Sequence, residues 1–158
     1  MTYVGRKFEQ NGRSWELVIP REAQVEYASR AGGTGLYFRN EDGQEVTSEN
    51  LSEYVHTGQN DERGRTARVK EKKPNAWGIH QSTGNVWKWV YAPWTRRLVD
   101  GVDPLHLNDD RIGSDHVGRG GGWRDVAVQC GSTRRDWNDP SNRWYYYGVV
   151  LALCPSEF

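Results

Sequence analysis

The sequence predicts one α+β domain in which a few short strands and one helix are joined by long, ordered loops. A chain of 158 residues is large enough to bury the core of one such domain. Three regions carry the prediction: an alternating N-terminal segment, a helical pattern that follows it, and a loop-rich remainder with short strand-like runs. No repeat, linker or low-complexity tract divides the chain.

The N-terminal unit, residues 1–19, is predicted to form a β-hairpin. Residues 2–9 alternate in polarity, and residues 14–19 form the returning strand. Between them, Asn11-Gly12 supplies the pair of positive-φ residues that a tight two-residue turn needs.

A helix is predicted over residues 21–30, directly after a proline of the kind that opens helices. Ala23, Tyr27 and Ala31 are spaced i, i+4 and i+8, which places them on one face of that helix. Gly32-Gly33 then ends it, because glycine is favoured just beyond a helix C-terminus.

The rest of the chain is predicted to consist mainly of loops, with short strands between turns. Residues 34–75 show no sustained periodicity, and residues 95–117 are again mostly irregular, with Asp-Pro and Asn-Asp turn signals. Strands are predicted around residues 86–90, 117–124, 129–135 and 147–153.

Composition and charge narrow the classes of function. The 21 basic and 21 acidic residues cancel, which argues against a nucleic-acid partner because such partners are held by phosphate neutralisation. The basic residues between positions 63 and 73 are interrupted by Glu71, and we interpret them as a solvated loop. No run approaches the roughly 20 apolar residues of a membrane span. The N-terminus carries no apolar stretch of signal-peptide type, so no membrane insertion is expected.

No residue pattern predicts a catalytic or metal site. His56, His80, His106 and His116 are not at metal-ligand spacing from one another or from the cysteines, and we interpret each as a surface or turn residue. No Ser-His-Asp or Cys-His pairing is indicated, and the glycine-rich residues 118–122 lack the lysine of a phosphate-binding loop. We expect no cofactor.

The last third of the chain, residues 119–152, has the composition of a recognition surface. Large aromatics alternate with arginines and short polar residues, and Trp144 is followed by three tyrosines. Tyr and Trp offer a large contact area with few rotatable bonds, while Asn, Asp and Ser offer adaptable hydrogen bonds. The alternative is a crowded aromatic core with buried hydroxyls. Against it, the alternation of a strand would place at least one of the tyrosines on the opposite face.

Three separated segments resemble one family of proteins. Residues 20–33, PREAQVEYASRAGG, resemble the family's helix motif P-T-E-A-E-W-E-Y-A-A-R-G-G. Residues 74–89 resemble P-N-A-F-G-L-Y-D-M-x-G-N-V-W-E-W, and residues 119–152 resemble R-G-G-S-W followed by P-x-x-R-x-x-x-x-G-F-R-L. Together they resemble the formylglycine-generating enzyme (sulfatase-modifying factor) type of C-type-lectin fold. The resemblance implies a single C-type-lectin-like domain with few strands and abundant ordered loops.

The enzymes of this family oxidise a substrate cysteine with copper held by two cysteines, and thiolates are soft ligands that suit Cu(I). Here the second cysteine is matched by Cys130, but the first by Asp125, and the serine of the glycine turn by Gly122. The resemblance therefore implies that this chemistry is absent, and Cys130 is expected to be free and buried. The family's calcium-binding glutamate is matched by Lys88, whose ammonium would repel calcium. The Asn-Asp-Asp run at residues 108–110 is interpreted as a turn.

A second branch of the family matches the last third better: the variable proteins of diversity-generating retroelements, found in phages, bacteria and archaeal viruses. These proteins use the fold to support a hypermutated C-terminal segment with the pattern R-G-G-S-W-x-x-x-A-x-x-C-R-S-A-x-R-x-x-x-x-P-x-x-R-x-x-x-x-G-F-R. The chain resembles this pattern from Arg119 to Gly148. It departs at Val149 and Val150, which replace the aromatic residue and the arginine of G-F-R.

Residues 119–152 are therefore expected to be a diversified ligand-binding segment, in which the free positions of the pattern form the binding face. Those positions are Arg124, Asp125, Val126, Val128, Gln129, Arg134, Asp136, Trp137, Asn138, Trp144, Tyr145, Tyr146 and Tyr147. The expected partner is a protein or another cell-surface ligand, with attachment to a larger assembly such as a virion. Two alternatives remain open: a relative of the formylglycine-generating oxidases, and a catalytically inactive structural subunit.

Overall fold

The computed structural model describes residues 6–60, 62–96, 98, 101 and 115–156. Its elements, in chain order, are β1 (Arg6–Gln10), β2 (Arg13–Val18), α1 (Glu22–Arg30), α2 (Leu51–Tyr54), β3 (Trp87–Pro93), β4 (His116–Arg119), the 3-10 helix η1 (Ala127–Cys130), β5 (Arg135–Asn138), β6 (Tyr147–Val149) and β7 (Ala152–Pro155). The predicted α+β class is confirmed, with few strands and long loops.

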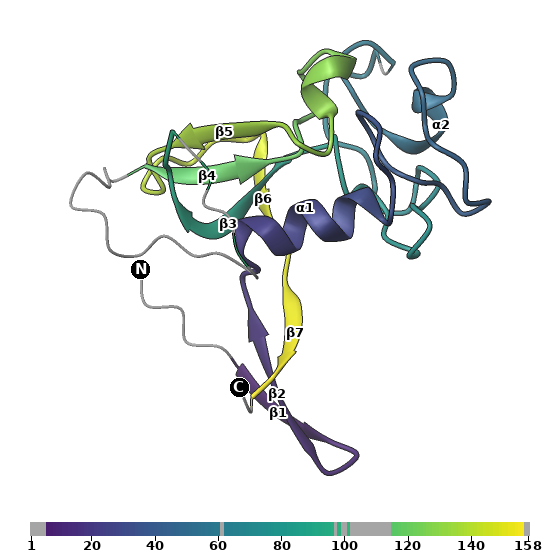
Figure 1. Cartoon of the computed structure of the whole chain (residues 1–158). Helices are drawn as coiled ribbons and strands as arrows, with labels where there is room; N and C mark the ends of the chain where they lie inside the picture. Colours follow the sequence, from purple (N-terminus) through teal and green to yellow (C-terminus); the bar gives the residue numbers. More distant parts are fainter. Residues whose placement is uncertain (1–5, 61, 97, 99–100, 102–114, 157–158) are drawn as a thin grey trace.

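Two sheets organise these elements. A four-stranded sheet has the order β5-β4-β3-β6, in which β6 runs parallel to β3 and the other neighbours are antiparallel. A three-stranded antiparallel sheet has the order β1-β2-β7 and projects from the body of the molecule as an arm (Figure 1). The chain passes from the first sheet to the second between β6 and β7. The C-terminal segment therefore ties the arm to the body.

The predicted hairpin is confirmed in the part of it that the structure describes, β1 and β2. Asn11 and Gly12 have φ values of 52° and 71°, the left-handed pair that closes a two-residue turn. The register pairs Phe8 with Trp15 and Gln10 with Arg13. The turn thus fixes the register of β1 against β2. A slip of one residue would exchange the two faces of this hairpin.

The predicted helix is also confirmed. The backbone N–H of Arg21 donates to the Gln24 side chain at 2.9 Å, and Ala31 ends the helix in the left-handed region with φ of 47°. The helix buries Val25 and Ser29. Of the residues predicted to share one face, Ala31 is buried, whereas Tyr27 is exposed and its ring contacts that of Trp77, with ring centroids 4.8 Å apart.

The core consists of two clusters. The smaller one joins α1 to the four-stranded sheet through Val25, Val90 and Val117. The larger one lies beneath α2 and the surrounding loops and comprises Tyr37, Phe38, Val46, Leu51, Tyr54, Val55 and Cys130. Helix α2 has only four residues, too short to produce a periodic pattern, which is why the sequence did not predict it.

The later strands are displaced from their predicted positions. The strand predicted around residues 129–135 is wrong: η1 occupies its beginning, a turn follows in which the N–H of Arg134 donates to Gly131 at 3.0 Å, and β5 starts only at Arg135. The strand predicted around residues 117–124 ends at Arg119. Its backbone then turns, since Gly120 and Gly121 both have positive φ.

His56 contradicts the surface or turn position predicted for every histidine. Its side chain is buried, and its Nε2 lies 2.8 Å from the Arg65 carbonyl oxygen. His80 and His116 are half-buried, and His106 and residues 108–110 lie outside the described residues. Within the described ranges, no three His, Cys, Asp or Glu side chains gather as metal ligands.

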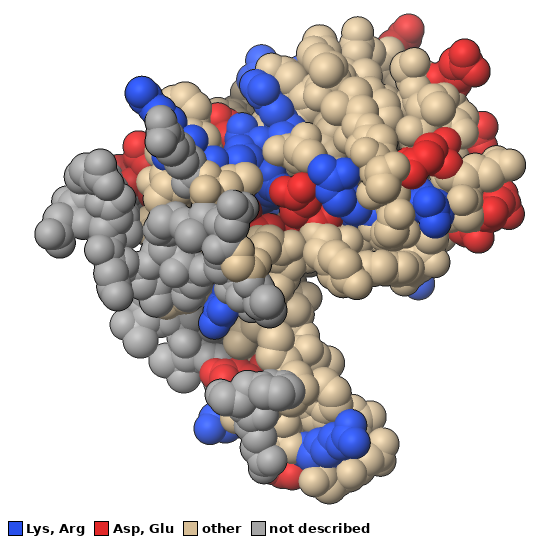
Figure 2. All heavy atoms as spheres, in the orientation of Figure 1, with Lys and Arg blue, Asp and Glu red and all other residues tan. Residues whose placement is uncertain are grey.

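Charge is distributed as the balanced composition predicts. Figure 2 shows basic and acidic side chains intermixed over one face of the body rather than a field of one sign. The basic loop around residues 63–73 is largely exposed, and an ion pair joins Arg63 to Glu71. No helix in the described part of the chain is long and apolar enough to cross a membrane.

Candidate functional site

The glycine turn after β4 positions the C-terminal segment. Gly120 and Gly121 have φ values of 88° and 72°, which favour glycine. A Cβ on Gly121 would lie 2.7 Å from the Gln129 carbonyl oxygen and 2.8 Å from the Cys130 sulfur. Only glycine therefore lets the turn pack against η1.

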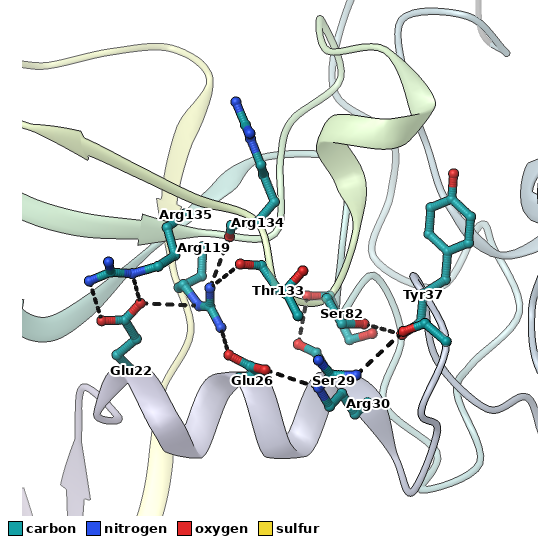
Figure 3. A network of polar contacts seen from close by, with 12 residues as sticks. Glu22, Glu26, Ser29, Arg30, Tyr37, Ser82, Arg119, Thr133, Arg134 and Arg135 are labelled. Atoms are coloured by element: carbon teal, nitrogen blue, oxygen red, sulfur yellow. Dashed lines mark hydrogen bonds and ion pairs between the residues drawn. The ribbon is translucent and has the colours of Figure 1, made fainter. Parts of the chain in front are cut away.

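A buried ionic network fixes the same turn to α1 (Figure 3). The Arg119 side chain is 1% exposed, and its guanidinium is bonded to the Glu26 carboxylate. Its Nη1 donates to the Thr133 carbonyl at 2.7 Å and its Nε lies 3.6 Å from Glu22. Arg135 also binds Glu22, donating from Nη2 at 3.0 Å. Helix α1 thus holds both ends of the segment that links β4 to β5.

Asp125, a predicted ligand-binding residue, has a structural role. Its Oδ2 accepts the Gly122 N–H at 2.8 Å, and its own N–H donates to the Gly122 carbonyl at 3.0 Å. Its carbonyl oxygen accepts the Gly58 N–H at 3.0 Å. The carboxylate closes the turn in which it lies, which leaves it only partly available to a ligand.

The tyrosine run forms a series of tilted and edge-on ring contacts that begins in the four-stranded sheet and reaches the surface, and we call this series the tyrosine stack. Tyr147 packs against Trp89 with ring centroids 4.4 Å apart, Tyr146 follows at 5.5 Å from Tyr147, and Tyr145 at 5.4 Å from Tyr146. Tyr147 and Tyr146 are half-buried, whereas Tyr145 is 63% exposed. The stack therefore presents its outermost ring on a rigid support.

Tyr147 anchors the inner end of this stack by a hydrogen bond to β5. Its hydroxyl donates to Asp136 Oδ2 at 3.0 Å. Burial, and after it the Asp136 carboxylate, raises the pKa of Tyr147, so the phenol stays protonated and remains a donor. This tyrosine belongs to the support rather than to the exposed face.

A hollow of about 300 Å³ lies beside the stack. Besides Trp87, the hollow is lined by six of the predicted residues: Arg124, Asp125, Gln129, Arg134, Asp136 and Tyr146. Arg124 is exposed and is bonded to the Tyr145 hydroxyl, with its guanidinium 5.6 Å from the centroid of the Tyr145 ring. The hollow thus combines two arginines and two carboxylates beneath an aromatic rim.

Val126 and Val128 extend this region along η1, 44% and 60% exposed, and Trp144 is 40% exposed. Trp137 is different, because it pairs with Val117 and so shares the sheet face that packs on α1. It is 52% exposed and stacks on Trp94 with ring centroids 4.8 Å apart. We call the predicted residues other than Trp137 and Tyr147 the C-terminal surface; none of them is buried.

Two residues of the site are absent from the binding positions predicted from the sequence. Trp87 lines the hollow, and the Trp123 ring lies 6.1 Å from Tyr145 and 5.7 Å from the Arg124 guanidinium. Both belong to family motifs that predict packing. Their second role depends on the neighbours that the fold brings to them.

A family model, the sulfatase-modifying factor enzyme 1-like domain, matches residues 4–153. The chain belongs to this family. Two solved structures share the fold of this sulfatase-modifying factor-like chain, each over 89% of its length with a TM-score of 0.68. One is Treponema denticola variable protein 1, with 27% sequence identity and 48% of its own chain covered. The other is PvdO from Pseudomonas aeruginosa, with 26% identity and 52% covered.

This member of the family therefore spans about half the length of those two proteins. No curated protein gives a significant match. The predicted resemblance to the formylglycine-generating enzyme type is confirmed by the family model. The predicted likeness to variable proteins agrees with the Treponema structure.

The residues at the family's copper position do not fit a Cu(I) ion. Burial, with a contribution from the Asp125 carboxylate, raises the pKa of Cys130 to about 12, so the thiol stays protonated at neutral pH. Cys130 is free and buried, as predicted. Cys154 lies in β7, paired with Glu16 of the arm. A carboxylate engaged in a turn and one protonated thiol are not a two-thiolate site.

Lys88 occupies the position of the family's calcium-binding glutamate. Its Nζ is buried and donates to the Gly84 carbonyl at 2.6 Å. Burial lowers the pKa of Lys88 to about 7. At the position that the resemblance matches to a calcium-binding glutamate, the Lys88 amine therefore binds a carbonyl oxygen.

Proposed function

We propose that the chain is a non-catalytic receptor that binds a protein or another cell-surface ligand through the C-terminal surface. The observation that carries the proposal is the exposed, rigidly supported aromatic rim around the hollow beside the tyrosines, which we call the Arg124 hollow. Tyr, Trp and Arg dominate the energetics of protein interfaces. Soluble monomers seldom expose such a patch without a partner.

The separation of support from surface favours a diversified segment. The support comprises the buried Arg119, the glycine turn and Cys130. By contrast, Arg124, Val126 and Tyr145 make few contacts that the fold requires and are exposed. Substitutions at exposed positions away from such structural features usually change stability little. The segment therefore suits the variable protein of a diversity-generating retroelement, in which these positions change while the fold persists.

Binding by this surface is expected to depend on Tyr145 and Arg124. A partner is first identified by screening the unaltered protein against purified extracellular protein domains. Tyr145→Ala and Arg124→Ala should then each raise the Kd for that partner by roughly 30-fold, the scale of an interface hot spot. Tyr91→Ala, a 37% exposed tyrosine of β3 outside this surface, is the matched control and should leave Kd unchanged. Partners that bind equally well to the two surface variants would contradict the proposal.

The retroelement origin has its own test, in the coding locus. We expect a neighbouring reverse-transcriptase gene and a near-repeat of codons 119–152. A locus with neither feature would remove the claim of diversification. The binding function would still stand on the variants above.

Oxidase activity, the alternative function, is expected to be absent. Incubated with Cu(I) and a sulfatase-derived cysteine peptide, the chain should leave the mass of the peptide unchanged, because Cys130 is matched with Asp125 rather than with a second thiol and its own thiol stays protonated. Mass spectrometry detects the loss that accompanies formylglycine formation. Tight stoichiometric copper binding together with turnover would overturn this expectation and favour the enzyme.

A further inference from the structure

A second cavity lies away from the C-terminal surface, between α1 and the chain that connects β6 with β7. Its volume is about 380 Å³, and it shares no residue with the hollow beside the tyrosines. Figure 1 shows α1 lying across this connection. Val25, Ile79, Val150 and Leu151 give it a mainly apolar wall. A concave apolar cavity with a few polar groups is the usual form of a small-molecule site.

Gln81 is the first of the polar groups that line this cavity. Its side chain is 94% buried, because its exposed fraction is 6%, and neither its amide nitrogen nor its amide oxygen has a hydrogen-bond partner within the described structure. A buried unpaired amide is costly. Its backbone φ of 52° is also unfavourable for a residue other than glycine. The fold thus holds an unsatisfied amide in the wall of the cavity.

Lys88 is the second polar group that lines the cavity. It is 7% exposed, and within the described residues it forms no ion pair with a carboxylate. Its one hydrogen bond, to Gly84, uses a single donor of an ammonium that has three. A buried cation without a counter-ion is unfavourable, and an anion beside it would be stabilised.

We infer that this cavity binds a small carboxylate with an apolar body, whose chain packs on the apolar wall and whose carboxylate is bound by Lys88 and Gln81. The carboxylate supplies the missing counter-charge and accepts a hydrogen bond from the Gln81 amide nitrogen. A cation of the same shape would instead be repelled by Lys88. The site is independent of the C-terminal surface and of the receptor function proposed for it.

Octanoate is the probe, and 1-octanol is its neutral control. Calorimetry should give one saturable site for octanoate, with affinity at least about tenfold above that of octanol at pH 6.5, the scale of a hydrogen bond to a charged group. Lys88→Met keeps the aliphatic stem and should abolish the preference. Ala28→Phe, which fills the cavity from α1, should abolish binding of both compounds.

The pH dependence tests Lys88 in the unaltered protein. Lys88 is protonated below its pKa of about 7, so octanoate affinity should fall by up to tenfold per pH unit above 7, while octanol affinity stays constant. Other titratable groups lie near. Arg119 is the cross-strand neighbour of Lys88 and is already paired with Glu26. Cys130 stays a neutral thiol, and His80 and Cys154 line the cavity. His80→Gln and Cys154→Ser should therefore retain the pH profile.

Each other outcome overturns the inference. Octanoate that binds no better than octanol would show that Lys88 supplies no counter-charge. Binding that survives Ala28→Phe would place the ligand elsewhere. If Lys88→Met does not fold, a flat pH profile in the unaltered protein is by itself decisive against the site.

Discussion

Replacing Trp87 by alanine is expected to lower the free energy of unfolding by about 3–5 kcal/mol, the usual cost of truncating a core tryptophan. Trp87 is 4% exposed, and its ring stacks with Tyr147 at a centroid distance of 6.2 Å. Its backbone N–H donates to the Tyr146 carbonyl at 2.8 Å. The strand that carries Trp87 and the tyrosine run are thus joined by a backbone hydrogen bond as well as by the ring contact. Urea denaturation followed by circular dichroism measures the change.

Trp77→Ala is the matched control, because it removes the same side chain from a 46% exposed position. Its edge contact with Tyr27 is the main interaction lost, and a change of about 1 kcal/mol or less is expected. Equal losses in the two variants would show that Trp87 does not carry the core packing assigned to it. A second readout is ligand binding, which Trp87→Ala should weaken because this ring lines the Arg124 hollow.

The elements that were predictable from sequence are those whose cause is local. Asn11-Gly12 determines the hairpin turn by its φ values alone, and the proline and glycines around α1 mark its ends. The strand boundaries after residue 119 were not predictable, because β5 forms by pairing with β4 across the glycine turn. That pairing depends on contacts remote in sequence, which no short pattern encodes.

In the candidate site, too, some features were predictable from the sequence and others were not. Aromatic content predicted the exposed positions, and Tyr145, Trp144, Val126 and Val128 are indeed exposed. The pattern assigned Trp137 to the same face, but its register opposite Val117 places it on the α1 side of the sheet. Asp125 counted as a free position, although its carboxylate closes a turn. The free positions of the pattern therefore include residues with a structural role as well as exposed ones.

The three consecutive tyrosines show that composition alone does not predict which side chain is anchored and which is exposed. The position of each residue relative to the strand is also needed. Only Tyr147 lies in β6, where it pairs with Trp87 and is anchored on Asp136, whereas Tyr145 lies in the preceding turn and is exposed. The predicted alternation of the three tyrosines across a strand is therefore wrong, because Tyr145 and Tyr146 precede β6. The start of the strand decides which of the three rings is anchored.

Arg119→Met is expected to destabilise the protein by about 3–5 kcal/mol, because it breaks a buried ion pair by removing one partner. The guanidinium binds Glu26, approaches Glu22 at 3.6 Å and donates to the Thr133 and Arg134 carbonyls at 2.7 and 3.2 Å. Burial lowers the pKa of Arg119, and the two carboxylates oppose that shift. Without the arginine these carboxylates repel each other, and the carbonyls lose their donor.

The charge, the geometry and the position of Arg119 can be separated by further variants. Arg119→Lys keeps the charge but lacks the planar fork, so its stability should fall between those of the methionine variant and the unaltered protein. Lys73→Met removes a cation from an exposed pair with Glu53, 2.6 Å apart, and should leave the urea midpoint nearly unchanged. If Arg119→Met is as stable as the unaltered chain, the network in Figure 3 does not hold the C-terminal segment on α1. If it is destabilised as expected, loss of Arg119 should also weaken ligand binding, since the same network positions the turn that carries Arg124.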